Sequence, residues 1–250
     1  MIQFFRRIRQ KLLANNQMKK YVLYAIGEIA LVMIGILLAL QVNTWNQDRQ
    51  LQQEEREILQ RLLVEFQGNS NQLTVIQEDQ IMVGVRLRKL LDAMGSNPKR
   101  LAKDSISLYL GMLSYIPKFT PKQGGLSSVI NSGKIGLIQN MELNDLLSQW
   151  PGMIDEYSYH QEIIYDISKQ QVLDVMLDHY PFRDHQVDVG YGSTGPSEFD
   201  YDQTKVLSSM AIETLAELKR VDSEIVSNRI LELQKVHLRV IELIHEELNE

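Results

Sequence analysis

The sequence contains no cysteine among its 250 residues. Without cysteine the chain can form neither a disulfide nor a thiolate metal site. Extended β patterns are also missing: apolar and polar residues alternate only briefly, and candidates such as residues 186–189 are isolated. We therefore predict an all-α fold.

Acidic residues are missing from the first twenty positions. The basic residues of that stretch are Arg6, Arg7, Arg9, Lys11, Lys19 and Lys20. All 32 acidic residues follow Lys20 together with 20 of the 26 basic residues, so residues 21–250 carry a formal charge of −12. The positive-inside rule predicts a cytoplasmic N-terminus, and a strongly acidic remainder argues against nucleic-acid binding.

The sequence has only one long hydrophobic run, YVLYAIGEIALVMIGILLAL at 21–40, in which Glu28 is the only charged residue. At 1.5 Å per residue the run spans roughly 30 Å, the thickness of a bilayer's hydrocarbon core. We expect an uncleaved transmembrane helix over 21–42. A cleaved leader is the alternative, but its apolar region would be shorter and would end at a better cleavage site than Leu38-Ala39-Leu40-Gln41.

The flanks of this run fit a membrane interface. Residues 1–20 form a basic amphipathic segment with Phe4, Phe5, Ile8 and Leu12 on one helical face, suited either to lying on the bilayer or to setting orientation alone. Trp45 is interpreted as an interfacial anchor. No second run of about 18 apolar residues follows, so residues 43–250 are expected to form one exported domain.

A stripe on the predicted membrane helix has 4-4-3-4 spacing. Its members are Tyr24, Glu28, Val32, Gly35 and Ala39. Small residues on a stripe allow close helix approach in lipid, and an intramembrane carboxyl is costly unless it is protonated or paired. We therefore expect this face to contact a second helix, in a homo-oligomer or in another membrane protein. Glu28 lying close enough to the cytoplasmic side to be hydrated is the alternative.

Several segments together resemble one protein family. They are Tyr24-Ala25-Ile26-Gly27-Glu28-Ile29, residues 34–41, Asn43-Thr44-Trp45-Asn46, the Phe-Phe-Arg-Arg start and residues 131–138. This set is similar to an uncharacterised family of single-span membrane proteins, a domain of unknown function common in Gram-negative genomes. The resemblance implies a protein of the bacterial inner membrane, with a single transmembrane helix and a periplasmic C-terminal domain. It implies no catalytic residues. It covers the chain to about residue 140, and Thr44 departs from the expected second Asn.

Helical periodicity continues beyond the membrane segment. An alternating 4-3 spacing runs across Gly68 and favours one continuous helix that ends at Gly95-Ser96-Asn97-Pro98. Its members are Leu62, Phe66, Asn69, Leu73, Ile76, Gln80, Val83, Leu87, Leu90 and Met94. Asp104 is predicted to cap a short helix through about Ser114. An irregular connection, 116–125, and two helical turns around Ser132-Gly133 follow.

The remainder is predicted to hold two more helices. The first is capped by Asn140 or Asn144 and runs to about His179, with a kink or staggered start at Pro151. The second covers 203–250 with a possible pause at 221–223, and its apolar stripe is Val226, Ile230, Leu233, His237, Val240 and Ile244. We expect an antiparallel helical bundle continuous with the membrane helix.

Candidate chemistry is sparse. Trp150, Tyr157, Tyr159, His160 and Tyr165 could line a ligand pocket, although bundle core with hydroxyls at the rim is the preferred interpretation. Asp178, His179, Asp184, His185 and Asp188 could hold a divalent metal, but their spacing matches no known site and an acidic loop predicts the same residues. Phosphate binding at Gly124-Gly125 lacks the Lys-Ser/Thr of a P-loop.

These patterns lead to a non-enzymatic prediction with no cofactor, no metal and no catalytic residue. The leading hypothesis is a membrane-anchored helical scaffold or interaction subunit that contacts the lipid bilayer and is oligomeric or part of a larger envelope complex. One alternative is a ligand-sensing module that acts through a partner. The other is a proton-linked subunit that uses Glu28.

Overall fold

The computed structural model describes residues 18–176, 180, 181, 183 and 197–249. All regular structure in this described part is helical, as predicted. The chain divides into two units, residues 1–56 and 57–250, and the longest helix, α2 (Met18–Leu91), contributes to both.

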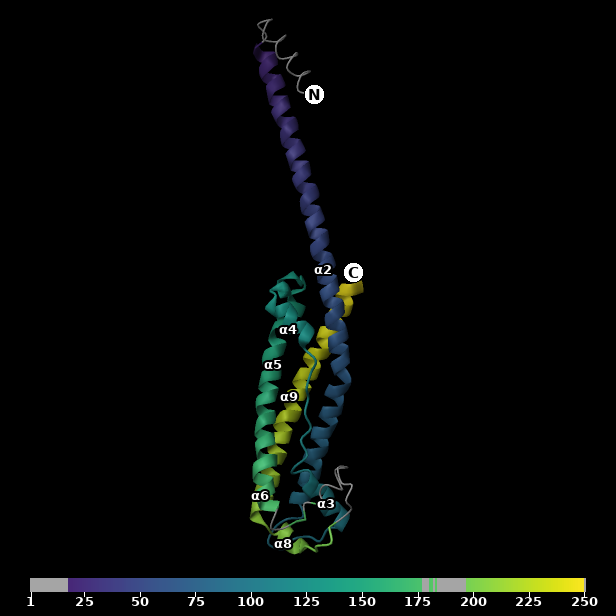
Figure 1. Cartoon of the computed structure of the whole chain (residues 1–250), viewed down its shortest axis with the longest axis vertical. Coiled ribbons are helices and arrows are strands. Elements are labelled where there is room, and N and C mark those ends of the chain that lie inside the picture. The colour runs from purple at the N-terminus through teal and green to yellow at the C-terminus, as the bar shows by residue number, and fades with distance from the viewer. Residues whose placement is uncertain (1–17, 177–179, 182, 184–196, 250) are drawn as a thin grey trace. The chain divides into compact units, whose positions relative to one another are not determined.

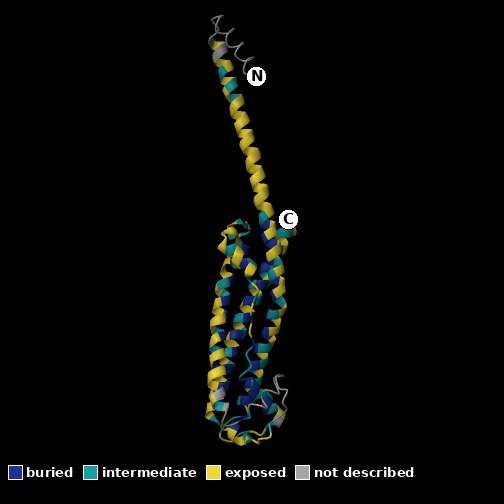
Figure 2. Cartoon of the chain, viewed as in Figure 1, coloured by how far each residue is buried: buried dark blue, intermediate teal, exposed yellow. Residues whose placement is uncertain are grey.

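In the first unit, α2 is unusually exposed. Every residue from 31 to 53 is exposed, including Leu37, Leu40 and Trp45 (Figure 2). Among the described helices, α2 alone is long and apolar enough to cross a membrane, and no described residue buries its most apolar window. Length and composition are the whole of this evidence, and a signal sequence near the N-terminus would meet the same test.

The second unit is built around the rest of α2 and two other helices, α5 (Met141–Asp166) and α9 (Met210–Asn249), shown in Figure 1. The Ser70 and Gln77 side chains of α2 bond His237 and Ser227 of α9, so the two helices run in opposite directions. Glu142 and Glu156 of α5 pair with Arg239 and Arg229, so α5 is also antiparallel to α9.

Shorter elements complete this unit. They are α3 (Lys103–Gly111), α4 (Gly124–Asn131), the 3-10 helix η1 (Lys134–Leu137), the π-helical turn η2 (Ile167–Gln171), α6 (Val172–Met176) and α8 (Gln203–Leu207). The two turns around Ser132-Gly133 are thus confirmed, and Gly133 has a φ of 73° at the N-cap of η1.

The apolar periodicity is confirmed on both long helices. On α2 the predicted stripe is buried from Leu62 to Leu90, and α2 is unbroken at Gly68. Met94, the last predicted member, lies beyond the helix end and is only half-buried. All six predicted stripe residues of α9 are buried. Burial of such side chains contributes about 1.5–3 kcal/mol each, so these stripes hold the unit together.

Helix ends are where the sequence predictions were partly wrong. Asp104 lies inside the first turn of α3, whose N-cap is Ala102, and α3 ends at Gly111 rather than near Ser114. The pause expected at 221–223 is absent, because α9 runs through it, and the break falls at 208–209. Asn140 does cap α5 and accepts a hydrogen bond from Leu143 N at 3.0 Å. Pro151 lies within α5.

Two apolar cores form within residues 57–250. The first contains Leu62, Phe66, Trp150 and Leu233, and the second contains Val83, Leu87, Leu110 and Ala216. Buried polar residues lie between the two sets along each long helix: Gln77 and Gln80 on α2, Lys219 and Ser223 on α9. Two of them, Gln80 and Lys219, hydrogen-bond the backbone of residues 113–117.

Candidate functional site: a polar layer around an extended segment

We call residues 115–123 the strap. It links the turn after α3 to α4 without helix or strand, and it is the thin teal trace that runs lengthwise among the helices in Figure 1. Pro117 and Phe119 of the strap are buried. Buried backbone groups need hydrogen-bond partners, and the strap has no neighbouring strand to provide them.

The α2 helix holds the C-terminal end of the strap. The Asn69 amide donates to Lys122 O at 2.7 Å and accepts from Lys122 N at 2.9 Å. With its amide oxygen and nitrogen exchanged, Gln72 pairs in the same way with Thr120. These side chains replace the two-way hydrogen bonding that a partner strand would supply, which explains why Asn69 interrupts an apolar stripe.

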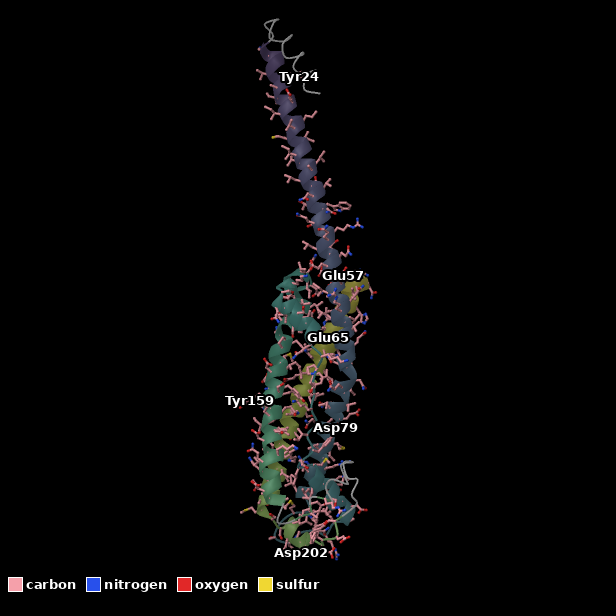
Figure 3. The ribbon with its side chains drawn as sticks, in the orientation of Figure 1. Tyr24, Glu57, Glu65, Asp79, Tyr159 and Asp202 are labelled. Carbon is pink, nitrogen blue, oxygen red and sulfur yellow. The ribbon has the colours of Figure 1, made fainter. Side chains whose placement is uncertain are left out.

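The start of α4 is held by an acid from α2. The Glu65 carboxylate, labelled in Figure 3, accepts from Gly125 N at 2.6 Å and Leu126 N at 3.1 Å. A carboxylate is favoured there because the first N–H groups of a helix are unsatisfied and its N-terminal dipole end is positive. The chain's own acid thus occupies the place where an anion would bind at Gly124-Gly125.

The middle of the strap is bonded from both sides. The Gln80 and Gln161 amides both donate to the Pro117 carbonyl oxygen, at 3.4 and 3.0 Å. Phe119 N donates to the Tyr157 hydroxyl at 2.8 Å, and burial raises the pKa of Tyr157 to about 12. Tyr157 therefore keeps its proton at physiological pH.

A buried lysine holds the N-terminal end. Lys219, fully buried on α9, donates to Leu113 O at 3.1 Å, to Tyr115 O at 2.8 Å and to Ser168 Oγ. Three acceptors match the three N–H groups of an ammonium. Burial nevertheless lowers the Lys219 pKa to about 7, against the opposing effect of the Asp222 carboxylate. Ser168 lies in η2, and π-helical turns of this kind are frequent at functional sites.

The polar layer is the set of buried polar side chains of α2, α5 and α9 in this region, namely Asn69, Gln77, Gln80, Gln161, Lys219 and Ser223. Several of its atoms have no hydrogen-bond partner in the described part of the chain. They are Oε1 of Gln77, Gln80 and Gln161, and Ser223 Oγ. Leaving such a group unbonded costs about 1–3 kcal/mol, so each needs an explanation. Two cavities border them: one of about 230 Å³ is lined by Gln80 and Ser223, and one of about 250 Å³ is lined by Gln161.

His237 lies in the first core, apart from this layer. Its ring stacks on Phe66 with centroids 5.2 Å apart, and its Nε2 lies 2.9 Å from Ser70 Oγ. Burial lowers its pKa to about 4, so the ring is neutral near pH 7. His237 is thus a core histidine that is hydrogen-bonded to Ser70 through Nε2, while its Nδ1 has no partner in the described part of the chain.

The predicted aromatic cluster is divided. Trp150 and Tyr157 are buried, whereas Tyr159 and Tyr165 are 63 % and 52 % exposed (Figure 3 marks Tyr159 on α5). Helix geometry explains the exposure of Tyr159, because two positions from Tyr157 is the opposite face of α5. The expectation of core packing thus fails for Tyr159 and Tyr165, although Tyr165 lines the 250 Å³ cavity.

All residues of the predicted membrane-helix interface belong to the first unit. Tyr24 and Val32 are 39 % and 56 % exposed, Glu28 is half-buried, and no atom would meet a Cβ added at Gly35 within 4 Å. Ala39 and Lys19 are exposed. Arg6, Arg7, Arg9 and Lys11 lie outside the described residues, as does the side chain of Lys20.

Metal ligation has no support in the described residues, which bring together no group of three or more His, Cys, Asp or Glu side chains. The five residues Asp178, His179, Asp184, His185 and Asp188 lie outside the described residues. The polar layer was not predicted as a site, although Asn69 and Gln80 on an apolar stripe were its visible signal.

Comparison of the chain with protein-family models, with curated proteins and with solved structures gives no match.

Proposed function

We propose that the protein is a membrane-anchored scaffold or interaction subunit, in which residues 57–250 form an antiparallel helical bundle on the periplasmic side of a bacterial inner membrane. The observation that carries this proposal is the apolar part of α2, which the rest of the chain leaves uncovered. An exposed Leu, Ile or Val gains about 1.5–3 kcal/mol on leaving water, so a lipid bilayer is the environment that suits these side chains.

Charge supports the orientation. The six basic residues before position 21, with no acid among them, favour a cytoplasmic N-terminus, and the acidic remainder favours export. The resemblance of residues 21–46 to single-span proteins of Gram-negative bacteria agrees with this location. The proposal assigns no catalytic residue.

The absence of cysteine makes the topology directly testable, because an introduced cysteine is the only thiol. We expect the single variant Ser127→Cys to react with a membrane-impermeant maleimide in spheroplasts, and Asn15→Cys to react only after lysis. The protein should remain in the membrane pellet after carbonate washing. Labelling of both positions before lysis, or release by carbonate, would contradict the proposal.

Association is proposed to use the Tyr24, Glu28, Val32, Gly35 and Ala39 face. Under mild oxidation we expect Ala39→Cys to crosslink to a dimer or to a heavier partner. Leu37→Cys, two positions away and therefore on the opposite helix face, is the matched control and should stay monomeric. Monomer at both positions, or equal crosslinking at both, would count against this interface.

A ligand-sensing module is the second candidate, and the two cavities of the second unit favour it, one lined partly by the strap and the other by α2 and α9. Both are bordered by buried glutamines that donate to the same Pro117 oxygen. A ligand that bonded either glutamine would act on a segment that contacts α2, α5 and α9. As in the sequence-based alternative, such a module would act through a partner.

A further inference from the structure

The cavity of about 250 Å³ lies between the strap and α5. Its lining consists of Ile116, Lys118, Tyr157, Ser158, Gln161, Glu162 and Tyr165. Pockets for drug-sized ligands measure about 300–1,000 Å³, so this cavity suits a small metabolite. It lies wholly within residues 57–250, so an inference about it does not depend on membrane anchoring.

Gln161 lines this cavity and has an unfilled acceptor that is itself buried. Its side chain is only 4 % exposed, and its nitrogen is committed to Pro117 O at 3.0 Å. Its Oε1 has no hydrogen-bond partner in the described part of the chain. A bound N–H donor would remove the cost of this unbonded oxygen, and a charged ammonium would form the stronger bond.

The rim carries one charge of each sign. Lys118 and Glu162 are exposed lining residues, and neither has a salt bridge to another described residue. Nearby Glu156, by contrast, is paired with Arg229 at 2.7 Å. Lys118 and Glu162 therefore suit a ligand that has both a carboxylate and an ammonium.

The remaining lining is apolar or donates hydrogen bonds. Ile116 and the Tyr165 ring offer an apolar wall, and an aromatic face also attracts an ammonium. The Tyr157 oxygen accepts from Phe119 N, while its O–H proton has no acceptor among the described residues.

We propose that this cavity binds a free α-amino acid with an apolar side chain. On binding, the Gln161 amide turns so that Oε1 accepts from the ammonium, which lies near Glu162. The carboxylate faces Lys118, and the side chain packs on Ile116 and Tyr165. The 230 Å³ cavity between α2 and α9 is a weaker candidate, because its Arg220 is already paired with Glu217 and Glu224.

The test is isothermal titration of the full chain in detergent with L-leucine, L-methionine and L-phenylalanine. We expect at least one of them to bind. The analogues of leucine that lack one charged group, 4-methylpentanoate and 3-methylbutylamine, should bind at least about tenfold more weakly, the loss expected for one charge-assisted hydrogen bond. Equal binding of either analogue, or no binding of any of the three amino acids, would overturn the proposal.

Variants of the exposed rim separate binding from folding. Glu162→Gln and Lys118→Gln should each weaken amino-acid binding about tenfold while leaving the melting temperature of the free protein unchanged. Asp155→Asn and Lys169→Gln are matched controls, because both residues are exposed and outside the cavity lining. Wild-type affinity in both rim variants, or an equal loss in the controls, would refute the assigned roles.

Discussion

Lys219 shows how burial and hydrogen bonding oppose each other at a single residue. Its nitrogen has three acceptors, as a charged ammonium requires, yet removal from water disfavours that charge. A buried charge is weak evidence for stability, since an apolar residue of similar volume is often tolerated. The lysine is better explained by the strap that it positions.

The Lys219 pKa predicts a pH dependence. Burial lowers this pKa from 10.5 to about 7. Between these values the unfolded chain binds a proton that the native protein lacks, so raising the pH favours the native state. From about pH 7 to about pH 9, the free energy of unfolding of the wild type should rise by up to about 1.4 kcal/mol per pH unit relative to Lys219→Met.

Urea unfolding in detergent, followed by circular dichroism, measures this difference. Lys169→Met, at an exposed position of η2, is the control and should show the wild-type pH profile. Parallel profiles for the wild type and Lys219→Met would show that Lys219 has an ordinary pKa in the native protein.

Glu65 is the clearest case at the scale of an element, because one side chain of α2 caps another helix. Glu65→Ala leaves the Gly125 and Leu126 N–H groups without this acceptor, so we expect a loss of about 1–3 kcal/mol in the free energy of unfolding. Amide hydrogen exchange at Gly125 and Leu126 should accelerate. Glu78→Ala, at an exposed position of α2, is the control and should change neither quantity.

Sequence periodicity predicted the buried faces of the long helices better than it predicted where the helices end. The stripes of α2 and α9 were predictable because burial recurs at helical spacing. Helix ends were harder: Asn140 caps its own helix through a local contact, whereas α4 is capped by Glu65, sixty residues earlier in the chain. The polar layer could not be predicted for the same reason, since only tertiary packing brings Gln80, Gln161 and Lys219 to the same segment.

At the scale of the whole molecule, both apolar cores lie within residues 57–250. We therefore expect a fragment of these residues to remain in solution without detergent and to unfold cooperatively in urea. The full chain, which adds the exposed apolar stretch of α2, should require detergent. A fragment that aggregates, or that unfolds without a cooperative transition, would contradict this expectation.

The ties of the strap also set an order of events during synthesis. Leu113 precedes Lys219 by 106 residues, so a ribosome makes the carbonyls long before the amine that bonds them. Until α9 emerges, the nascent chain has Asn69 and Glu65 to hold one end of the strap and nothing from α9 to hold the other. Synthesis of Lys219, near the start of α9, is therefore the step that supplies the missing hydrogen bonds of the strap.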